Sequence, residues 1–238
     1  MLLAASGASV SAQQSGPLNL QLDVQPTASF MAGNMTRVSY VVANAPRSTD
    51  RLFEFAVRSP VPVWRLEVPR PATHFLGATR EGEENVASWG WLDDMPGPGE
   101  ATPVLAYEAI GLPGIVSYRA LRYYGVRPAD DTTAHQPLRF DHAGREYTIG
   151  KTVGVVPLPL DLRPSALALR LRRLTTEACA LGWISVPATC RSLRANATPS
   201  ARALRAFHRE LVDQRAKAVS EAAFALLEPN VGFLLGKL

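Results

Sequence analysis

The sequence predicts an α+β fold class: an N-terminal antiparallel β-sandwich, Ig-like with about seven strands, followed by a small C-terminal four-helix bundle. In the first two thirds of the 238 residues, apolar and polar residues alternate in short runs separated by proline and glycine. From about Ser165 onward, leucine and alanine recur every three or four positions, the spacing of amphipathic helices. Basic residues also concentrate there: residues 160–238 hold 12 Lys and Arg against 6 Asp and Glu, and the remainder holds 13 against 15.

The first part of the chain, residues 1–15, is expected to be a remnant signal peptide or a disordered tail. Small and apolar residues end in Val10-Ser11-Ala12, an acceptable signal-peptidase site. A positively charged start is missing, so both interpretations stand. Cleavage after Ala12 places the start of the mature chain near Gln13.

Residues 16–156 are assigned to the sandwich, which opens with three strand-like runs. Leu18 to Val24 alternates strictly between apolar and polar residues, as a half-buried strand does. Residues 38–44 and 52–57 follow with a turn-rich segment between them, and we expect them to form an antiparallel pair. Prolines interrupt residues 61–69, which therefore belong at a sheet edge or in a loop.

The second half of the sandwich continues the same pattern. Residues 86–91 place Trp89 and Trp91 on one side of a strand, and residues 104–110 alternate again. A turn then leads into another strand at 112–120. The remaining segments are expected to be a polar loop or linker at 127–147 and a last short strand at 147–157.

A proline-rich linker, residues 157–164, leads to the helical bundle at 165–238. Gly182 is a natural stop for the first helix, and a short second helix is expected at 187–196. The helix ends are read from caps and breakers: Thr198 before Pro199 opens a third helix, Ser220 caps a fourth, and Pro229 ends or kinks that fourth helix. Short turns between four helices favour an antiparallel bundle.

The two cysteines of the chain, Cys179 and Cys190, lie on either side of the turn after the first helix. Two cysteines in an exported protein usually form a disulfide, and we expect that pairing here. The alternative is a pair of buried thiols in a cytosolic protein. Without histidines nearby, the spacing does not resemble a zinc site.

The helical part contains four characteristic motifs: Leu181-Gly-Trp-Ile184, Cys190-Arg-Ser-Leu-Arg194, Ala203-Leu-Arg-Ala-Phe207 and Glu221-Ala-Ala-Phe-Ala-Leu-Leu227. With these motifs, residues 166–235 resemble the helical FIMAH-type domain that is attached to many exported bacterial proteins. The resemblance implies a leucine-rich helical fold and a non-catalytic accessory role. The segment between the second and third helices is shorter than in that family, and Pro229 departs from its pattern.

The strand-rich part contains the motifs Tyr40-Val-Val-Ala-Asn44, Ser88-Trp89, Leu112-Pro-Gly-Ile-Val116 and Gly150-Lys-Thr-Val-Gly154. With these motifs, residues 18–155 resemble the uncharacterised exported bacterial β-sandwich domains that often precede such bundles. This resemblance implies no biochemical activity.

Signatures of catalysis are weak along the chain. Gly150-Lys-Thr152 lacks the earlier glycine that a phosphate-binding loop needs and is interpreted as a turn. No two histidines have the spacing of a helical metal site, and we expect neither a cofactor nor a metal. Carboxylates cluster at Glu81, Glu83 and Glu84 and at Asp93 and Asp94, in turns where solvated charge is expected.

Two groups of side chains are candidates for ligand binding. Trp64 and Trp91 could present aromatic surface to a sugar or a peptide, whereas Trp89 is expected in the core. Arg170, Arg172 and Arg173 form the densest basic cluster, on the first predicted helix opposite its leucines. The cluster could bind an acidic surface, but a solvated helix face is its default interpretation.

These observations favour a non-catalytic protein that is secreted, periplasmic or on the cell surface and has a binding or structural role. Its partner is expected to be an extracellular glycan or envelope polymer, with no transmembrane helix and no specific nucleic-acid motif. One alternative is an extracellular hydrolase that acts on a polymer through its loop carboxylates. Another is a basic helical module that binds a polyanion.

Overall fold

The computed structural model describes residues 20–67, 74–81, 84–91, 94–123 and 147–238. Within them the fold is α+β: two antiparallel sheets are followed by four helices, in agreement with the coarse prediction. The predicted N-terminal segment and nearly all of the predicted loop at 127–147 lie outside the described residues.

The described strands form one sheet with the order β1-β2-β7-β4 and a second with the order β5-β6-β3-β8-β9. These are nine strands instead of the expected seven or so; the strand that the sequence analysis did not anticipate is β5, which pairs along its length with β6. Their bounds are β1 (Leu22–Met31), β2 (Met35–Asn44), β3 (Leu52–Ser59), β4 (Val63–Glu67), β5 (His74–Glu81), β6 (Glu84–Trp91), β7 (Leu105–Ile110), β8 (Leu112–Arg122) and β9 (Tyr147–Val156).

The expected pairing of residues 38–44 with 52–57 is wrong. These runs are β2 and β3, and they lie in different sheets: β2 pairs with β1 and β7, whereas β3 pairs with β6 and β8. The side chain of Asn44 donates hydrogen bonds to the backbone oxygens of Asp50 and Pro96 where the chain passes between the sheets. Alternation identifies the buried face of a strand, but it does not identify the neighbouring strand.

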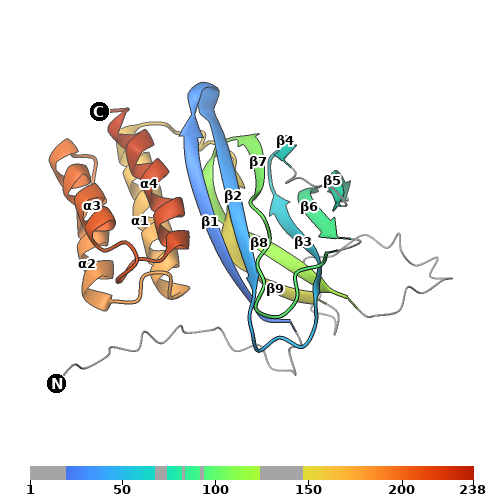
Figure 1. Ribbon diagram of the computed structural model, residues 1–238. Coiled ribbons are helices and arrows are strands. Elements are labelled where there is room, and N and C mark those ends of the chain that lie inside the picture. The colour runs from blue at the N-terminus through green and yellow to red at the C-terminus, as the bar shows by residue number, and fades with distance from the viewer. Residues whose placement is uncertain (1–19, 68–73, 82–83, 92–93, 124–146) are drawn as a thin grey trace, which may run out of the picture.

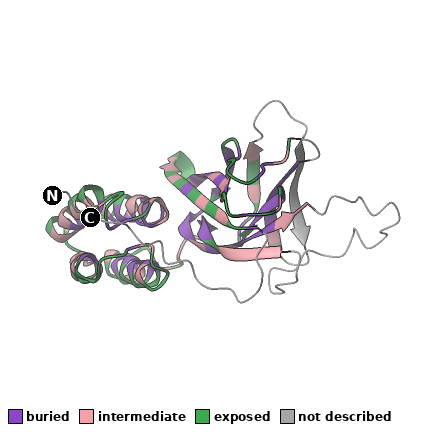
Figure 2. Ribbon diagram, turned by 60° about the horizontal axis from the view of Figure 1, so that its bottom comes forward, coloured by how far each residue is buried: buried purple, intermediate pink, exposed green. Residues whose placement is uncertain are grey.

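The two sheets share one hydrophobic cluster, which combines aliphatic with aromatic side chains, and the strands carry buried residues where the sheets face each other (Figure 2). Tyr40 of the first sheet donates a hydrogen bond of 2.7 Å to the backbone oxygen of Val153 in the second. The hydroxyl of Tyr107 accepts one of 2.9 Å from the backbone N–H of Val155. Burial raises the pKa of both phenols, so each remains a neutral hydrogen-bonding group between the sheets.

The four helices are α1 (Pro164–Ala180), α2 (Pro187–Asn196), α3 (Ala201–Asp213) and α4 (Glu221–Leu235). Each helix contacts the next along the chain, and α1 also contacts α4. Helices α1 and α4 lie on the side of the sheets, and α2 and α3 form the outer pair (Figure 1). Leucines at helical spacing, among them Leu167, Leu171 and Leu174 of α1, fill the space between the helices. The predicted stripe of apolar residues therefore does form the core of this part.

The helix ends agree with the predictions in part. Ser220 caps α4, since its hydroxyl accepts from the backbone N–H of Ala223, and Gly182 follows α1 with a positive φ of 73°. The predicted cap at Thr198 is wrong, because α3 begins two residues later with Ser200 in the capping position. Pro229 does not end α4, which continues to Leu235.

The helices are packed against the edge where the two sheets come together. Helix α4 contacts β1 of the first sheet and β8 and β9 of the second. Phe233 meets Phe30 edge-to-face with a centroid distance of 5.2 Å, and Val153 of β9 belongs to the same hydrophobic cluster as the helix leucines. The sheets and the helices therefore share a buried interface, which fixes the helices relative to the strands.

Residues Gly150, Lys151 and Thr152 lie within β9 and do not form a turn. Gly150 and Lys151 pair with Tyr118 and Ser117 of β8. An extended, ladder-bonded segment cannot wrap its amides around a phosphate, so the structure supports the rejection of a phosphate-binding loop.

Candidate anion-binding site

A hollow with a volume of about 570 Å³ lies on the surface of α1 and extends to the end of α2. Half of the residues that line it are arginines, and no acidic residue is among them. The lining residues are Pro159, Ala166, Leu169, Arg170, Arg172, Arg173, Thr176 and Arg194. The structure thus brings all three arginines of the predicted basic cluster to one place and adds a fourth from another helix.

The local sequence explains why these side chains face outward. Leu167, Leu171 and Leu174 bury one face of α1 in the bundle, so the residues between them lie on the opposite and lateral faces. Leu169 is on that outer side and remains 68% exposed. A patch of apolar surface therefore lies beside the guanidinium groups.

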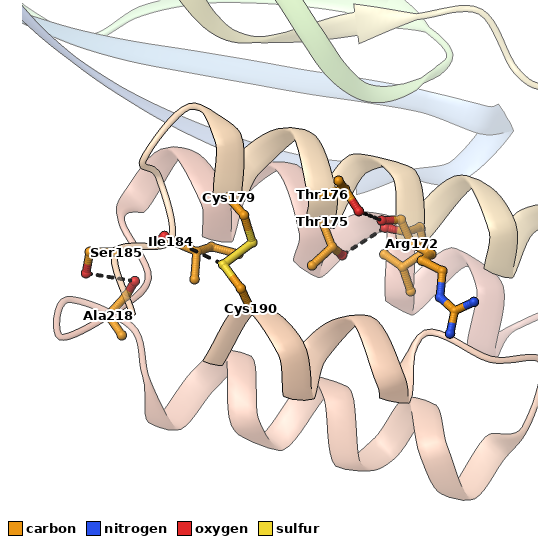
Figure 3. The surroundings of a disulfide bond; sticks show 9 residues. Arg172, Thr175, Thr176, Cys179, Ile184, Ser185, Cys190 and Ala218 are labelled. Carbon is orange, nitrogen blue, oxygen red and sulfur yellow. Dashed lines mark hydrogen bonds between the residues drawn. A yellow bond between two sulfur atoms is a disulfide. The ribbon is translucent and has the colours of Figure 1, made fainter. Parts of the chain in front are cut away.

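The disulfide holds α1 and α2 together on the side of the bundle that carries the hollow. Cys179 near the end of α1 is bonded to Cys190 in the first turn of α2, with 6.2 Å between their Cα atoms. Figure 3 shows this bond between the two helices and Arg172 extending from α1 toward α2. The Nε of Arg172 donates a hydrogen bond of 3.1 Å to the backbone oxygen of Arg194.

Arg170 differs from the other arginines of the hollow because it is largely buried. Its guanidinium donates to the backbone oxygen of Pro113 at 3.1 Å and to the Oδ1 of Asn230 at 3.4 Å. Burial lowers its pKa, and the positive charge of Arg173 acts in the same direction. Arg170 therefore does not belong to a fully solvated face, because its hydrogen bonds anchor α1 to β8 and α4. It still lines the hollow, and its role in ligand binding stays a prediction.

The remaining three arginines have little compensating negative charge. Arg173 lies 3.6 Å from Glu177 in an exposed pair one helical turn away, which is a weak interaction in water. Among the described residues, no carboxylate lies within 4.0 Å of Arg172 or Arg194. These like charges raise one another's energy, and a bound anion would lower it.

Guanidinium groups in this arrangement suit a particular chemistry. Each presents a planar fork of N–H donors that matches the oxygens of carboxylate, sulfate or phosphate groups. The lining of the hollow contains no aromatic residue, and its apolar part consists of Leu169, Ala166 and Pro159. The arrangement can therefore bind acidic groups on a ligand.

The two candidate tryptophans have different surroundings. Trp91 is 1% exposed and lies in the cluster between the sheets, so its candidacy for ligand binding is wrong. Trp89 is buried as expected, and its Nε1 donates to the backbone oxygen of Glu67. Trp64 is 66% exposed on β4, the edge strand of the first sheet at the side opposite β1. Helix α4 contacts β1, so Trp64 and the arginine-lined hollow lie at opposite sides of that sheet.

Of the acidic clusters of the hydrolase hypothesis, only Asp94 has a described side chain. The side chains of Glu81, Glu83 and Glu84, together with Asp93, are not described. Among the described residues, no group of three or more His, Cys, Asp or Glu side chains could hold a metal ion. His208 lies 3.5 Å from Glu228 on the neighbouring helix.

Sequence reasoning missed Arg194, which belongs to the motif Cys190-Arg-Ser-Leu-Arg194. A signal was present, because four residues separate Cys190 from Arg194 and so place both on one side of a helix. Once the disulfide joins Cys190 to Cys179, the rest of that side of α2 must run along α1. The outer arginines of the two helices then come close together.

No protein-family model matches this chain, and no curated protein is significantly similar to it. None of the helices in the described part of the chain is long and apolar enough to cross a membrane.

Proposed function

We propose that this protein is a non-catalytic binding protein whose helical part binds an acidic polymer through the arginine-lined hollow. The observation that carries the proposal is the convergence of Arg172, Arg173 and Arg194 around one hollow. Within the described parts of the chain, the one carboxylate within 4.0 Å of these three is that of Glu177. On an ordinary solvated helix face, basic side chains are spread out or form ion pairs with acidic side chains. Here two helices direct theirs to the same space.

The hydrolase alternative receives less support from the described residues. Two carboxylates that face each other in a cleft are the requirement for polymer hydrolysis, and the lining of the hollow contains none. The resemblance of residues 166–235 to a non-catalytic accessory domain favours binding as well.

The proposed place of action is outside the cytosol: secreted, periplasmic or on the cell surface. The bond between Cys179 and Cys190 supports this, since disulfides persist in oxidising compartments and are rare in the cytosol. An acidic extracellular glycan or envelope polymer is the corresponding class of ligand. Mass spectrometry of the protein from its native source tests the location, with a start near Gln13 and no free thiol expected.

For the β part, we propose an Ig-like sandwich enlarged to nine strands. The order β1-β2-β7-β4 corresponds to strands A, B, E and D of that fold, and β9-β8-β3 corresponds to G, F and C. The β5–β6 hairpin extends the second sheet beyond β3. On this proposal the sandwich is a rigid support that presents the helices.

The binding proposal is tested with polygalacturonate, a carboxylated polysaccharide, by isothermal titration calorimetry over a range of salt concentrations. We expect an affinity that falls steeply as salt rises, because association releases counterions from the polymer. Replacing Arg172 and Arg194 together by glutamine should weaken binding about tenfold or more, since each charge-assisted hydrogen bond contributes about 1.5–3 kcal/mol.

The matched control removes two positive charges elsewhere. Arg47 and Arg51 are exposed in the β2–β3 connection, so R47Q/R51Q changes the net charge equally without touching the helices. We expect it to bind almost as the wild type does. Equal weakening in both double variants would show that net charge, and not the hollow, determines binding. Affinity independent of salt would also refute the proposal.

A further inference from the structure

A second basic hollow, with a volume of about 440 Å³, lies between α3 and the end of α4. Its lining consists of Arg202, Arg205, His208 and Arg209 from α3 and Leu235 from α4. The three arginines are exposed and follow one another at intervals of three and four residues, which places them in a row along one side of α3. At the rise of an α-helix the row is about 10 Å long.

The charge of this row is also uncompensated. Among the described residues, no carboxylate lies within 4.0 Å of Arg202, Arg205 or Arg209. The acid at the margin is Glu228, which lies 3.5 Å from His208. A row of free guanidinium groups suits a linear chain of anionic groups better than a single small ion.

The two hollows lie on opposite sides of the bundle. Helix α1 contacts α2 and α4, and α3 contacts α2 and α4, so the four helices occupy the corners of a square (Figure 2). The first hollow is on the side formed by α1 and α2, and the second is on the side formed by α3 and α4. A short ligand in one hollow therefore cannot reach the other without passing around the bundle.

The chemistry of the lining favours an acidic polysaccharide over a nucleic acid in the first hollow, and the second hollow offers a single ring, that of His208, on which a base could stack. Proteins that bind single-stranded nucleic acids combine a basic groove with aromatic side chains on which bases stack. Among the described residues, the lining of the first hollow has no aromatic side chain, and the lining of the second has one aromatic ring, the imidazole of His208. Each has arginines next to aliphatic surface, Leu169 in the first and Leu235 in the second.

We propose that the α3–α4 hollow is a second binding site for acidic polysaccharide, so that one molecule binds two chains and bridges them. The bridging rests on the proposed function of the first hollow. The second site itself does not, because it involves different helices and different arginines. Two sites on one rigid support increase the overall affinity for a long polymer and link separate chains.

The test uses the full chain with its disulfide intact and a short oligogalacturonate, too short to reach around the bundle. Calorimetry should show that each wild-type protein molecule binds two molecules of oligogalacturonate. We expect one equivalent for R205Q/R209Q and one for R172Q/R194Q. With long polygalacturonate, light scattering should report cross-linked particles for the wild type, and either double variant should abolish them while still binding the polymer.

The outcomes separate the two proposals. If the wild type bound a single oligogalacturonate and only R172Q/R194Q lost that binding, the second site would be overturned and the first would stand. If the wild type bound a single oligogalacturonate and only R205Q/R209Q lost that binding, both the first site and the bridging would be overturned. R47Q/R51Q is the charge-matched control and should retain two equivalents and the scattering. Single-stranded DNA of the same length that bound with equal affinity would overturn the assignment to polysaccharide.

Discussion

The side-chain amide of Asn230 donates a hydrogen bond of 3.0 Å to the backbone oxygen of Pro113, which is 117 residues away in the sequence. This bond joins the buried face of α4 to β8. The same amide nitrogen lies 2.7 Å from the backbone oxygen of Leu226, one turn earlier in α4. Arg170 donates to Pro113 as well, so three elements meet at one carbonyl group.

Replacing Asn230 by alanine is expected to lower the free energy of unfolding by about 1–3 kcal/mol, because the hydrogen bond between α4 and β8 is lost and the carbonyl of Pro113 keeps only the donor from Arg170. Urea denaturation monitored by tryptophan fluorescence measures the change. Asn196→Ala at the end of α2 is the control, and a surface change of that kind should cost less than about 0.5 kcal/mol. Equal effects of the two substitutions would contradict a structural role for the Asn230–Pro113 bond.

Arg119 and Glu54 form an ion pair at 3.3 Å between β8 and β3, with side chains that are 1% and 11% exposed. Burial raises the pKa of Glu54, and the charge of Arg119 opposes that rise. Arg119→Met removes the positive charge that lowers the pKa of Glu54, so that pKa rises further. The folded state then binds the proton more tightly than the unfolded state does, and stability falls as the pH increases through this raised pKa.

The expected result for Arg119→Met is therefore a loss of stability that grows from about pH 4 to pH 7 and reaches about 3 kcal/mol at neutral pH. Urea unfolding at a series of pH values measures it. Arg65→Met is the control, because Arg65 is exposed and lies 3.9 Å from Glu67, too far and too solvated for a large effect. A destabilisation that is the same at every pH would argue against this account of Glu54.

Gly150 has no room for a larger side chain. A Cβ atom at this position would lie 2.5 Å from the ring of Tyr118, which packs in the cluster between the sheets. Gly150→Ala should therefore cost about 1–3 kcal/mol through overpacking. Lys151→Ala, at the exposed neighbouring position of β9, is expected to change stability little. Thermal unfolding of both variants makes the comparison, and an unaffected Gly150→Ala variant would disprove close packing at this point.

Removing the disulfide should destabilise the protein by about 3 kcal/mol, because the bond closes a short loop in the unfolded chain. The bond also holds together two helices whose outer arginines repel. We therefore expect Cys179→Ser/Cys190→Ser to lose more stability, relative to wild type, in low salt than in high salt, where the charges are screened. Thermal unfolding at several salt concentrations measures this difference. If the loss of stability did not depend on salt, the disulfide would not counteract repulsion between the arginines of α1 and α2.

Much of the local structure could be predicted from the sequence because it depends on neighbours along the chain. Leu167, Leu171 and Leu174 occur at helical spacing, and they do fill the core of the bundle. Cys179 and Cys190 flank a single turn, and the structure bonds them. Pro229 was misleading, because the tertiary contacts of α4 outweigh the cost of a proline inside the helix.

The candidate site could be predicted only in part. Arg172 and Arg173 lie in the hollow that the cluster suggested, but Arg194 comes from another helix and Arg170 is used to anchor α1. In the sequence, Trp91 and Trp64 were both candidates for ligand binding, because both lie close to a predicted turn. The opposite sheet covers Trp91 and leaves Trp64 exposed.

The sequence by itself determined the apolar face of most strands and of the helices, and where the helical part begins. Such patterns reflect backbone geometry, which repeats every two residues in a strand and every 3.6 in a helix. Only the tertiary structure decided that β2 and β3 belong to different sheets, that Arg170 is buried against Pro113, and that two groups of arginines lie on opposite sides of the bundle. Those properties depend on contacts between residues far apart in the chain, and no local pattern records them.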